Sequence, residues 1–257
     1  MIREDIFRSI TERAKGYKYA SMGYIDFDDC RNSEILRDDD GLILLRDKSK
    51  PLAMLHFAAN DFRLLLDAIA GIPGKLRMHF VPKEFAAQLR ELGFAEWGEY
   101  VDFFNTDIEK TAERIGSAGE AEYLLTDDCA EVAAMSRRCR LQSRGFEGES
   151  EEWFRKWLDE NKVIIARKDS AIAGYCCVSI YDEGATLWIR EIAVDPKCQG
   201  LGLGKKLIEQ AVRYGAENGA VKGFLATDVL NKNAMGLFTK YDFRASGAES
   251  ELQMTRE

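Results

Sequence analysis

Several features that mark other classes of protein are scarce in this chain. Only two of the 257 residues are histidines, His56 and His79. Both lie in apolar stretches without surrounding partner residues, so we expect structural roles for them and no bound metal. No apolar run approaches the ~18 residues of a transmembrane helix, and the opening MIREDIFRSI lacks the apolar core of a signal peptide. These absences predict a cytoplasmic protein without a membrane partner.

Basic residues and paired cysteine motifs are also lacking. Lysine and arginine number 36 against 44 aspartates and glutamates, which gives a net charge of −8. Binding of nucleic acid needs a basic face to neutralise phosphates, so we expect no nucleic-acid partner. The six cysteines form no CxxC pair, and we interpret them as reduced thiols. Cys176 and Cys177 are neighbours that should point to opposite faces of one strand.

What the chain does contain is an ordinary globular composition, with 46% hydrophobic and 31% charged residues. Its length suits two domains. Small residues and glycine interrupt the succession of predicted helices and strands in the stretch IGSAGEAE, residues 115–122. We therefore predict one domain at 1–116 and a second at 117–257.

The first half alternates helical and strand patterns. We expect helices at 2–15, 62–70 and 83–92, and strands at 41–47, 51–58, 76–81 and 94–104. The first two strands are joined by the turn-prone KSK-Pro51, which predicts a hairpin. Asn60 or Asp61 should cap the helix at 62–70, and Gly71 should end it.

The second half repeats much of this order. We expect strands at 121–126, 162–168, 172–181, 185–194 and 221–229, and helices from 126 or 127 to about 140 and at 151–160, 203–219 and 231–241. The segments 243–247 and 251–256 should close the chain as a short antiparallel pair. The halves end alike, with LRELGF at 89–94 and FTKYDF at 238–243, which indicates a duplication.

Residues 194–206 read VDPKCQGLGLGKK, with three alternating glycines between a predicted strand and a predicted helix. Glycines at such a junction let the backbone approach a ligand closely, while helix N-terminal amides attract an anion, usually phosphate. A nucleotide P-loop is excluded because Gln199 stands where its first glycine is required. A dinucleotide fingerprint is excluded because Lys205 replaces its third glycine.

A third pattern fits, and it extends beyond the loop. Gln199-Gly200-Leu201-Gly202-Leu203-Gly204 matches the Q/R-x-x-G-x-G/A signature, IAVDP precedes it at 192–196, and Asn231-x-x-Ala234 with LFTKYDF follows. Over roughly residues 120–257 the chain resembles the GNAT superfamily of N-acetyltransferases. The resemblance implies an α/β fold of the α+β type, with a mixed, mostly antiparallel sheet flanked by helices. It also implies that the pyrophosphate of acetyl-CoA is bound by Gln199, Gly200, Leu201, Gly202, Leu203, Gly204 and Lys205.

The same resemblance assigns further residues to the cofactor. The strand holding Ile192, Ala193 and Val194 should bulge, so that its free backbone groups pair with the pantetheine arm and one amide polarises the thioester carbonyl. Asn231 should contact the cofactor or hold the following helix. Phe238 stands beside the cofactor where many family members carry tyrosine.

Acetyl transfer to an amine requires a base, because an alkylammonium has a pKa near ~10.4. Glu191 is the first candidate, and its side chain should face away from that of Ile192. Asp228, just before the Asn231 helix, is the second. The alternative for Glu191 is a solvated ion pair with Arg190, Arg213 or a lysine.

The general acid is less evident. Phe238 cannot donate a proton, and Tyr241, three residues further on, is a substitute that can also pack into the core. A thiol leaving group with a pKa near ~8.5 departs as thiolate with little assistance, so the enzyme need not be inactive. No activated nucleophile is visible, which favours direct attack in a ternary complex.

The acceptor is less constrained. Trp153 and Trp157, one helical turn apart, indicate a core or pocket wall. Their helix and the preceding loop LQSRGFEGES cover the acceptor site in the family. We expect a small-molecule or peptide amine as acceptor and a monomer or homodimer. The first half is interpreted as a degenerate GNAT-like copy or an unrelated α+β accessory domain. A silent acyl-CoA-binding protein, another acyl donor and a non-amine acceptor are alternatives.

Overall fold

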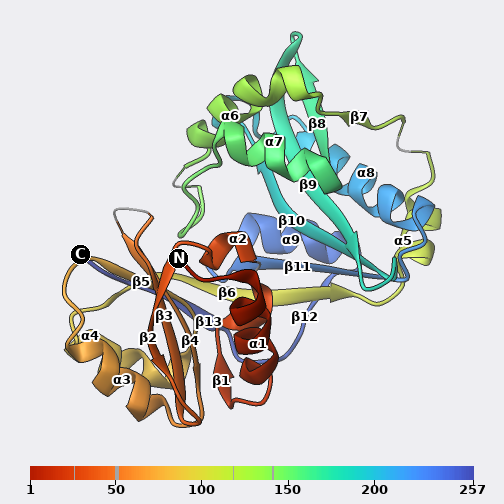
Figure 1. The fold of residues 1–257 in the computed structure, drawn as a ribbon. Coiled ribbons are helices and arrows are strands. Elements are labelled where there is room, and N and C mark those ends of the chain that lie inside the picture. Colours follow the sequence, from red (N-terminus) through yellow and green to blue (C-terminus); the bar gives the residue numbers. More distant parts are fainter. Residues whose placement is uncertain (26, 50–51, 118, 141) are drawn as a thin grey trace. The chain divides into compact units, whose positions relative to one another are not determined.

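The computed structural model describes residues 1–25, 27–49, 52–117, 119–140 and 142–257. The chain forms two compact units (Figure 1), unit 1 with Met1–Tyr100 and Glu249–Glu257, and unit 2 with Val101–Ala248. The sequence break had predicted a division at 116/117. The observed division comes earlier because the segment after Tyr100 packs into unit 2, where Ile108 is fully buried.

Unit 1 is built on a mixed sheet. Its strands are β1 (Tyr19–Ala20), β2 (Ser33–Asp38), β3 (Leu42–Asp47), β4 (Ala53–Ala59), β5 (Leu76–Pro82), the first part of β6 (Ala95–Asn105) and β13 (Glu251–Arg256). Its helices are α1 (Glu4–Ala14), α2 (Phe27–Cys30), α3 (Phe62–Ala70) and α4 (Ala86–Glu91). The strand order is β2-β3-β4-β5-β13-β6, with β1 beside β4.

Local sequence explains most of these elements. The apolar runs of β3 and β4 form the predicted antiparallel hairpin, although Lys50 and Pro51 of its predicted turn lie outside the described residues. The Asp61 side chain caps α3 by accepting a hydrogen bond from the amide of Arg63, and Gly71 follows the helix. The helices α3 and α4 bury one apolar core against the sheet, and α1 buries a second core.

Unit 2 contains the other strands of the sheet, which are again mixed in direction. Its strands are the last part of β6, β7 (Glu122–Tyr123), β8 (Lys162–Lys168), β9 (Ala171–Tyr181), β10 (Thr186–Val194), β11 (Lys222–Asp228) and β12 (Arg244–Ala245). Its helices are α5 (Ile108–Ile115), α6 (Cys129–Arg138), α7 (Glu151–Glu160), α8 (Leu203–Glu217) and α9 (Lys232–Lys240). The strand order is β6-β11-β10-β9-β8-β7, and β12 pairs with β6.

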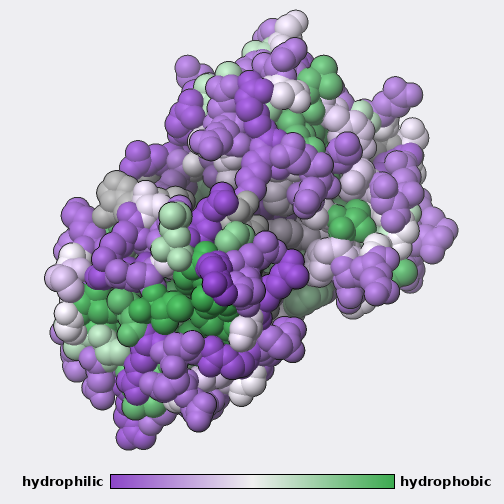
Figure 2. Space-filling view, in the orientation of Figure 1, coloured by the Kyte–Doolittle hydropathy of each residue, from purple (hydrophilic) through white to green (hydrophobic). Residues whose placement is uncertain are grey.

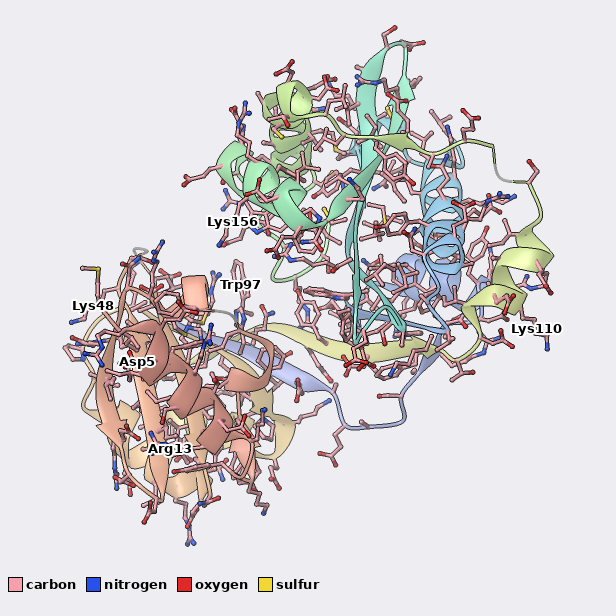
Figure 3. The ribbon with its side chains drawn as sticks, turned by 45° about the vertical axis from the view of Figure 1, so that its right-hand side comes forward. Asp5, Arg13, Lys48, Trp97, Lys110 and Lys156 are labelled. Atoms are coloured by element: carbon pink, nitrogen blue, oxygen red, sulfur yellow. The ribbon has the colours of Figure 1, made fainter. Side chains whose placement is uncertain are left out.

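Helices cover both faces of the unit 2 sheet, and side chains fill the space between the layers (Figure 3). On one face, α5, α8 and α9 bury a core that includes Leu207, Phe238 and Cys176. On the other face, α6 and α7 bury a core that includes Phe154 and Cys177. The neighbouring cysteines thus point to opposite faces, as alternation along a strand requires.

The predicted α/β fold class is confirmed, because each unit has a mixed, mostly antiparallel sheet with flanking helices. Parallel pairing joins β4 to β5 and β10 to β11. The predicted antiparallel pair at the end of the chain is wrong. The strand β12 pairs with β6, whereas β13 lies between β5 and β6 in unit 1. Burial explains this placement, since Leu252 and Met254 of β13 are enclosed in the unit 1 core.

The surface shown in Figure 2 differs between the units. A band of apolar side chains crosses the visible face of unit 1, while unit 2 presents mostly hydrophilic side chains. In unit 1, β2 exposes two large apolar residues, Ile35 and Leu36. Within the described residues, no helix has both the length and the apolar character to cross a membrane.

Candidate active site

The strand β10 carries a bulge at Arg190. Its register with β9 shifts between Ile189↔Val178 and Glu191↔Cys177, so Arg190 is the extra residue. The extra residue reverses the alternation of side chains along the strand. Ile189 and Ile192 therefore pack on the α8 face although three positions separate them, and Glu191 points to the α6 and α7 face. The family resemblance predicted a bulge at 192–194, directly after this position.

Beyond its first residues, β10 has an edge that β11 does not pair. In the part of the chain that the structure describes, the two strands pair at residues 186–188 and 222–224 only. The amide of Asp195 donates to the carbonyl of Ala173 on β9 at 2.8 Å. Because successive amides alternate in direction, the amides of Val194 and Ile192 point toward the opposite edge. This edge is suited to an extended ligand that adds to the sheet, such as a pantetheine arm.

The glycine loop between β10 and α8 exposes main-chain amides. Gly200 and Gly202 have φ angles of 77° and 80°, a left-handed conformation that other residues rarely adopt. Gly202 is the N-cap of α8 and provides no capping side chain. Lys206 makes the first helical bond, from its amide to the carbonyl of Gly202 at 3.0 Å. For the amides of residues 200–205, no acceptor exists among the described residues, so this helix N-terminus can bind an anion.

Neighbouring side chains fix the start of this loop. Asp195 accepts a hydrogen bond from the amide of Lys197 at 2.9 Å and pairs with Arg138 at 2.7 Å. The side-chain amide of Gln199 donates to Gln142 at 2.7 Å. Three further predicted residues line the loop and the first helical turn: Leu201 and Lys205 are exposed, and Leu203 is half-buried. Gly204 lies in the same turn, and a Cβ added to it would lie 3.5 Å from the side chain of Leu237.

Two predicted residues after β11 have structural partners. The side-chain oxygen of Asn231 accepts a hydrogen bond from the amide of Ala234 at 3.2 Å, so Asn231 holds the start of α9. Asp228 is 1% exposed and receives two hydrogen bonds from Arg144, at 2.9 and 3.3 Å. The amide of Leu230 donates to the same carboxylate at 2.8 Å. Both oxygens of Asp228 are therefore engaged, which favours a structural role.

The two predicted aromatic residues of α9 and its end lie in the core. Phe238 is 3% exposed, and its ring centroid is 6.3 Å from that of Phe103. The hydroxyl of Tyr241 donates to Glu209 of α8 at 2.8 Å, and burial and this carboxylate raise the pKa of Tyr241 above its usual value. Tyr241 belongs to the core on the α8 face, whereas Glu191 points to the other face. The structure thus does not bring Tyr241 and Glu191 together.

Glu191 is a buried carboxylate at the bulge. Its side chain is 11% exposed, accepts a hydrogen bond from the hydroxyl of Tyr175, and pairs with Arg190 at 3.2 Å. Burial, and secondarily the charge of Glu149, raises the pKa of Glu191 well above its ordinary value. The expected alternative of a solvated pair with Arg190 is half correct, because the pair exists but is enclosed.

Several residues that contact Glu191 or its neighbours were not predicted from the sequence. The hydroxyl of Ser136 lies 2.8 Å from that of Tyr175 and accepts the amide of Glu149 at 2.9 Å. Gly148 makes this contact possible, because its φ is 81° and a Cβ there would lie 2.9 Å from the backbone of Arg137. The second glycine in GFEGES, Gly148, was the available signal, but its contact with α6 depends on tertiary structure.

The predicted aromatic pair of α7 adjoins this network. The rings of Trp153 and Trp157 are stacked with centroids 5.2 Å apart, and both side chains are half-buried. The guanidinium of Arg190 lies 4.2 Å from the centroid of Trp153. The two indoles pack on one side against the core of the α6 and α7 face, and on another side they contact the guanidinium of Arg190. The pair is therefore both core and wall of the site.

Comparison with known proteins agrees with this geometry. The Acetyltransferase (GNAT) family model matches residues 130–243. A relative from Bacillus subtilis, named as an N-acetyltransferase for the alanine of ribosomal protein bS18, is 33% identical over 84 residues, covering 33% of this chain and 54% of that protein. A mycothiol acetyltransferase from Catenulispora acidiphila is 25% identical over 103 residues, covering 38% of this chain and 33% of that protein. The chain thus spans about half of the first relative and a third of the second.

A solved structure resembles the fold of most of the chain. The tandem GNAT protein from the clavulanic acid biosynthesis pathway matches with a TM-score of 0.56 and 13% identity, covering 84% of this chain and 78% of that one. At this identity the likeness concerns the fold alone. Residues 130–243 of the present chain form an acetyltransferase domain of the GNAT family. Among the described residues, no group of three or more histidine, cysteine, aspartate or glutamate side chains is arranged to hold a metal ion.

Proposed function

We propose that unit 2 is an N-acetyltransferase that moves an acetyl group from acetyl-CoA to a primary amine by direct attack in a ternary complex. The observation that supports this most strongly is the combination of free amides at residues 200–205 with the unpaired edge of β10. The loop from Gln199 to Lys205 would hold the pyrophosphate, and Ile192, Ala193 and Val194 would hold the pantetheine arm. An amide on this edge, that of Ile192 or Val194, would polarise the thioester carbonyl.

Glu191 is the proposed base. The attacking nitrogen must lose a proton, and a carboxylate with a raised pKa accepts it more readily than an ordinary one near neutral pH. In the transfer, the nitrogen–carbon bond forms, the carbon–sulfur bond breaks, and the thiol leaves as thiolate with pKa near ~8.5. This requires no general acid, which is consistent with Phe238 and with the distant hydroxyl of Tyr241. The engaged carboxylate of Asp228 is the weaker candidate for the base.

Unit 1 is proposed to be a degenerate GNAT-like copy. Like β10 and β11, β4 and β5 pair in parallel over only three residues, at 53–55 and 76–78. In unit 1, however, β1 pairs with the last residues of β4, through Tyr19↔Ala59 and Ala20↔Ala58. The chain itself thus occupies the edge that is open in unit 2. The tandem arrangement, with unit 1 as the degenerate copy, is supported by the likeness to the solved tandem GNAT fold.

The proposal is tested by release of free CoA. Protein, acetyl-CoA and a panel of primary amines are mixed, and acetylated product is identified by mass spectrometry. We expect CoA release that depends on the amine. A second function, silent acyl-CoA binding, is favoured by the lack of a hydroxyl at Phe238. CoA binding without turnover on a broad amine panel would support that function and contradict the transferase.

A further inference from the structure

The guanidinium of Arg190 lies in an aromatic–acidic cluster formed by Glu149, Trp153, Trp157 and Glu191. Its nitrogens are 3.1 Å from Glu149 and 3.2 Å from Glu191. Its central carbon is 4.2 Å from the centroid of Trp153 and 5.6 Å from that of Trp157. Two indoles and two carboxylates are together the environment that proteins use to bind organic cations.

The walls of this cluster are fixed by contacts that do not involve Arg190. Glu149 is positioned by a hydrogen bond from its main-chain amide to the hydroxyl of Ser136. Glu191 is positioned by the hydrogen bond that it accepts from the hydroxyl of Tyr175. Trp153 lies edge-on to Phe154, with centroids 5.1 Å apart, and is stacked on Trp157. Trp157 in turn donates from its indole nitrogen to the carbonyl of Lys162 at 3.1 Å. Removing the guanidinium would therefore leave the cluster in place.

Arg190, in contrast, is the extra residue of a bulge and is partly exposed. Its side chain is 27% exposed, and its long stem allows the guanidinium to move without moving β10. An anionic acceptor would meet two carboxylates that already use the donors of Arg190. A cationic acceptor would meet the same carboxylates and indole faces as favourable partners. The chemistry of the cluster thus selects for positive charge.

We propose that the guanidinium of Arg190 occupies the place of a second cationic group of the acceptor, which is an amine carrying a guanidinium or ammonium a few carbons away. The inference rests on the proposed function and specifies its substrate class. On binding, the acceptor's cation replaces Arg190 between Trp153 and Glu149. The reacting amine of the same molecule then lies toward Glu191, which takes its proton, and the unpaired edge of β10.

The first test measures binding without turnover, with agmatine as the probe and the protein–CoA complex in the cell of a calorimeter. Arg190→Ala removes the competing guanidinium, so agmatine should bind at least ~10-fold more tightly than to wild type. The double variant Arg190→Ala/Glu149→Gln should lose that gain, and thermal unfolding of each variant establishes that it is folded. Unchanged or weaker agmatine binding by Arg190→Ala would overturn the inference, because it would make Arg190 a structural or an anion-binding residue.

The second test compares agmatine with 6-methylheptylamine, an amine of the same length and branched end without the second cation. For wild type, kcat/KM should be at least ~10-fold higher for agmatine. Glu149→Gln should reduce this ratio to near unity, while the matched control Glu152→Gln, an exposed residue of α7, should preserve it. Equal kcat/KM values for the two amines in wild type would contradict the inference while leaving the transferase intact. Agmatine binding without any acetyl transfer would support the inference and contradict the transferase.

Discussion

The carboxylate of Asp61 accepts a hydrogen bond from the main-chain amide of Arg63 at 3.0 Å, at the N-terminus of α3. The helix α8 holds the corresponding place in unit 2, after β10, but starts at Gly202 without a capping side chain. Unit 1 therefore supplies its own anion where unit 2 leaves amides free. In the sequence, the segment AANDF at 58–62 of unit 1 thus stands where unit 2 has the glycine loop.

Gly202→Val should abolish most CoA binding. Valine is strained at a φ of 80°, so the loop must change conformation and its amides no longer converge. The matched control is Gly184→Val in the turn after β9, where φ is 91° and a Cβ also meets nothing within 4 Å. Calorimetry should show an affinity loss of at least ~10-fold for the first variant and nearly wild-type affinity for the second. Equal affinity losses in the two variants would argue against the loop as the binding site.

Glu191→Gln should lower kcat/KM by ~10²–10⁴-fold, the usual contribution of a general base. Because the pKa of Glu191 is raised, wild-type kcat/KM should increase with pH through that raised pKa, as the carboxylate becomes able to accept a proton. The variant should lack this limb of the profile. An unchanged pH profile in Glu191→Gln would assign the base to another group.

Asp228→Asn should lower the unfolding free energy without changing the pH dependence of catalysis. The substitution leaves the guanidinium of Arg144 without its buried counter-charge, but Arg144 keeps contact with solvent, so we expect a loss of ~1–3 kcal/mol. Chemical denaturation should show the decrease in unfolding free energy, and the folded variant should keep the wild-type pH dependence of kcat/KM. Loss of that pH dependence would instead make Asp228 the base.

Because His56 is buried, unit 1 should become less stable in acid. Burial lowers the pKa of His56 from 6.5 to about 4. Above pH 6.5 the imidazole is neutral in both states. As pH falls from 6.5 toward 4, the unfolded chain takes up a proton before the folded one, so the unfolding free energy decreases by about 3 kcal/mol in total. His56→Leu should remove this part of the pH dependence of denaturation, and identical curves for variant and wild type would contradict it.

Met254→Ala should destabilise unit 1, although the residue lies at the end of the chain. Its side chain is fully buried in the unit 1 core, and large-to-small changes at such sites cost ~2–5 kcal/mol. The neighbouring Gln253→Ala, at a half-buried polar position, is the matched control and should be nearly neutral. Amide hydrogen exchange should become faster in β3, β4 and β5 of the variant. Faster exchange in unit 2 alone would contradict the assignment of β13 to unit 1.

Local sequence predicted most helices and strands, because periodicity and caps are local signals. The helix 151–160 and the strand 162–168 were placed with their observed bounds. The helix α5 was missed although its signals are local, since Asp107 caps it and Ile108, Ala112 and Ile115 recur at helical spacing. The destination of β13 was missed because it depends on which distant surface buries its apolar side chains. The glycine loop was visible because backbone conformation demands glycine at fixed spacing. The network of Ser136, Tyr175 and Glu149 was not, because three separate segments meet only in the fold.

The central claim is that the amides of residues 200–205 bind the pyrophosphate of CoA. A crystal structure of the protein with CoA tests it most directly. We predict pyrophosphate oxygens within ~3 Å of these amides, with the pantetheine arm along residues 192–194 of β10. A pyrophosphate bound elsewhere, or no CoA at a concentration that saturates other acetyltransferases of the family, would contradict the account.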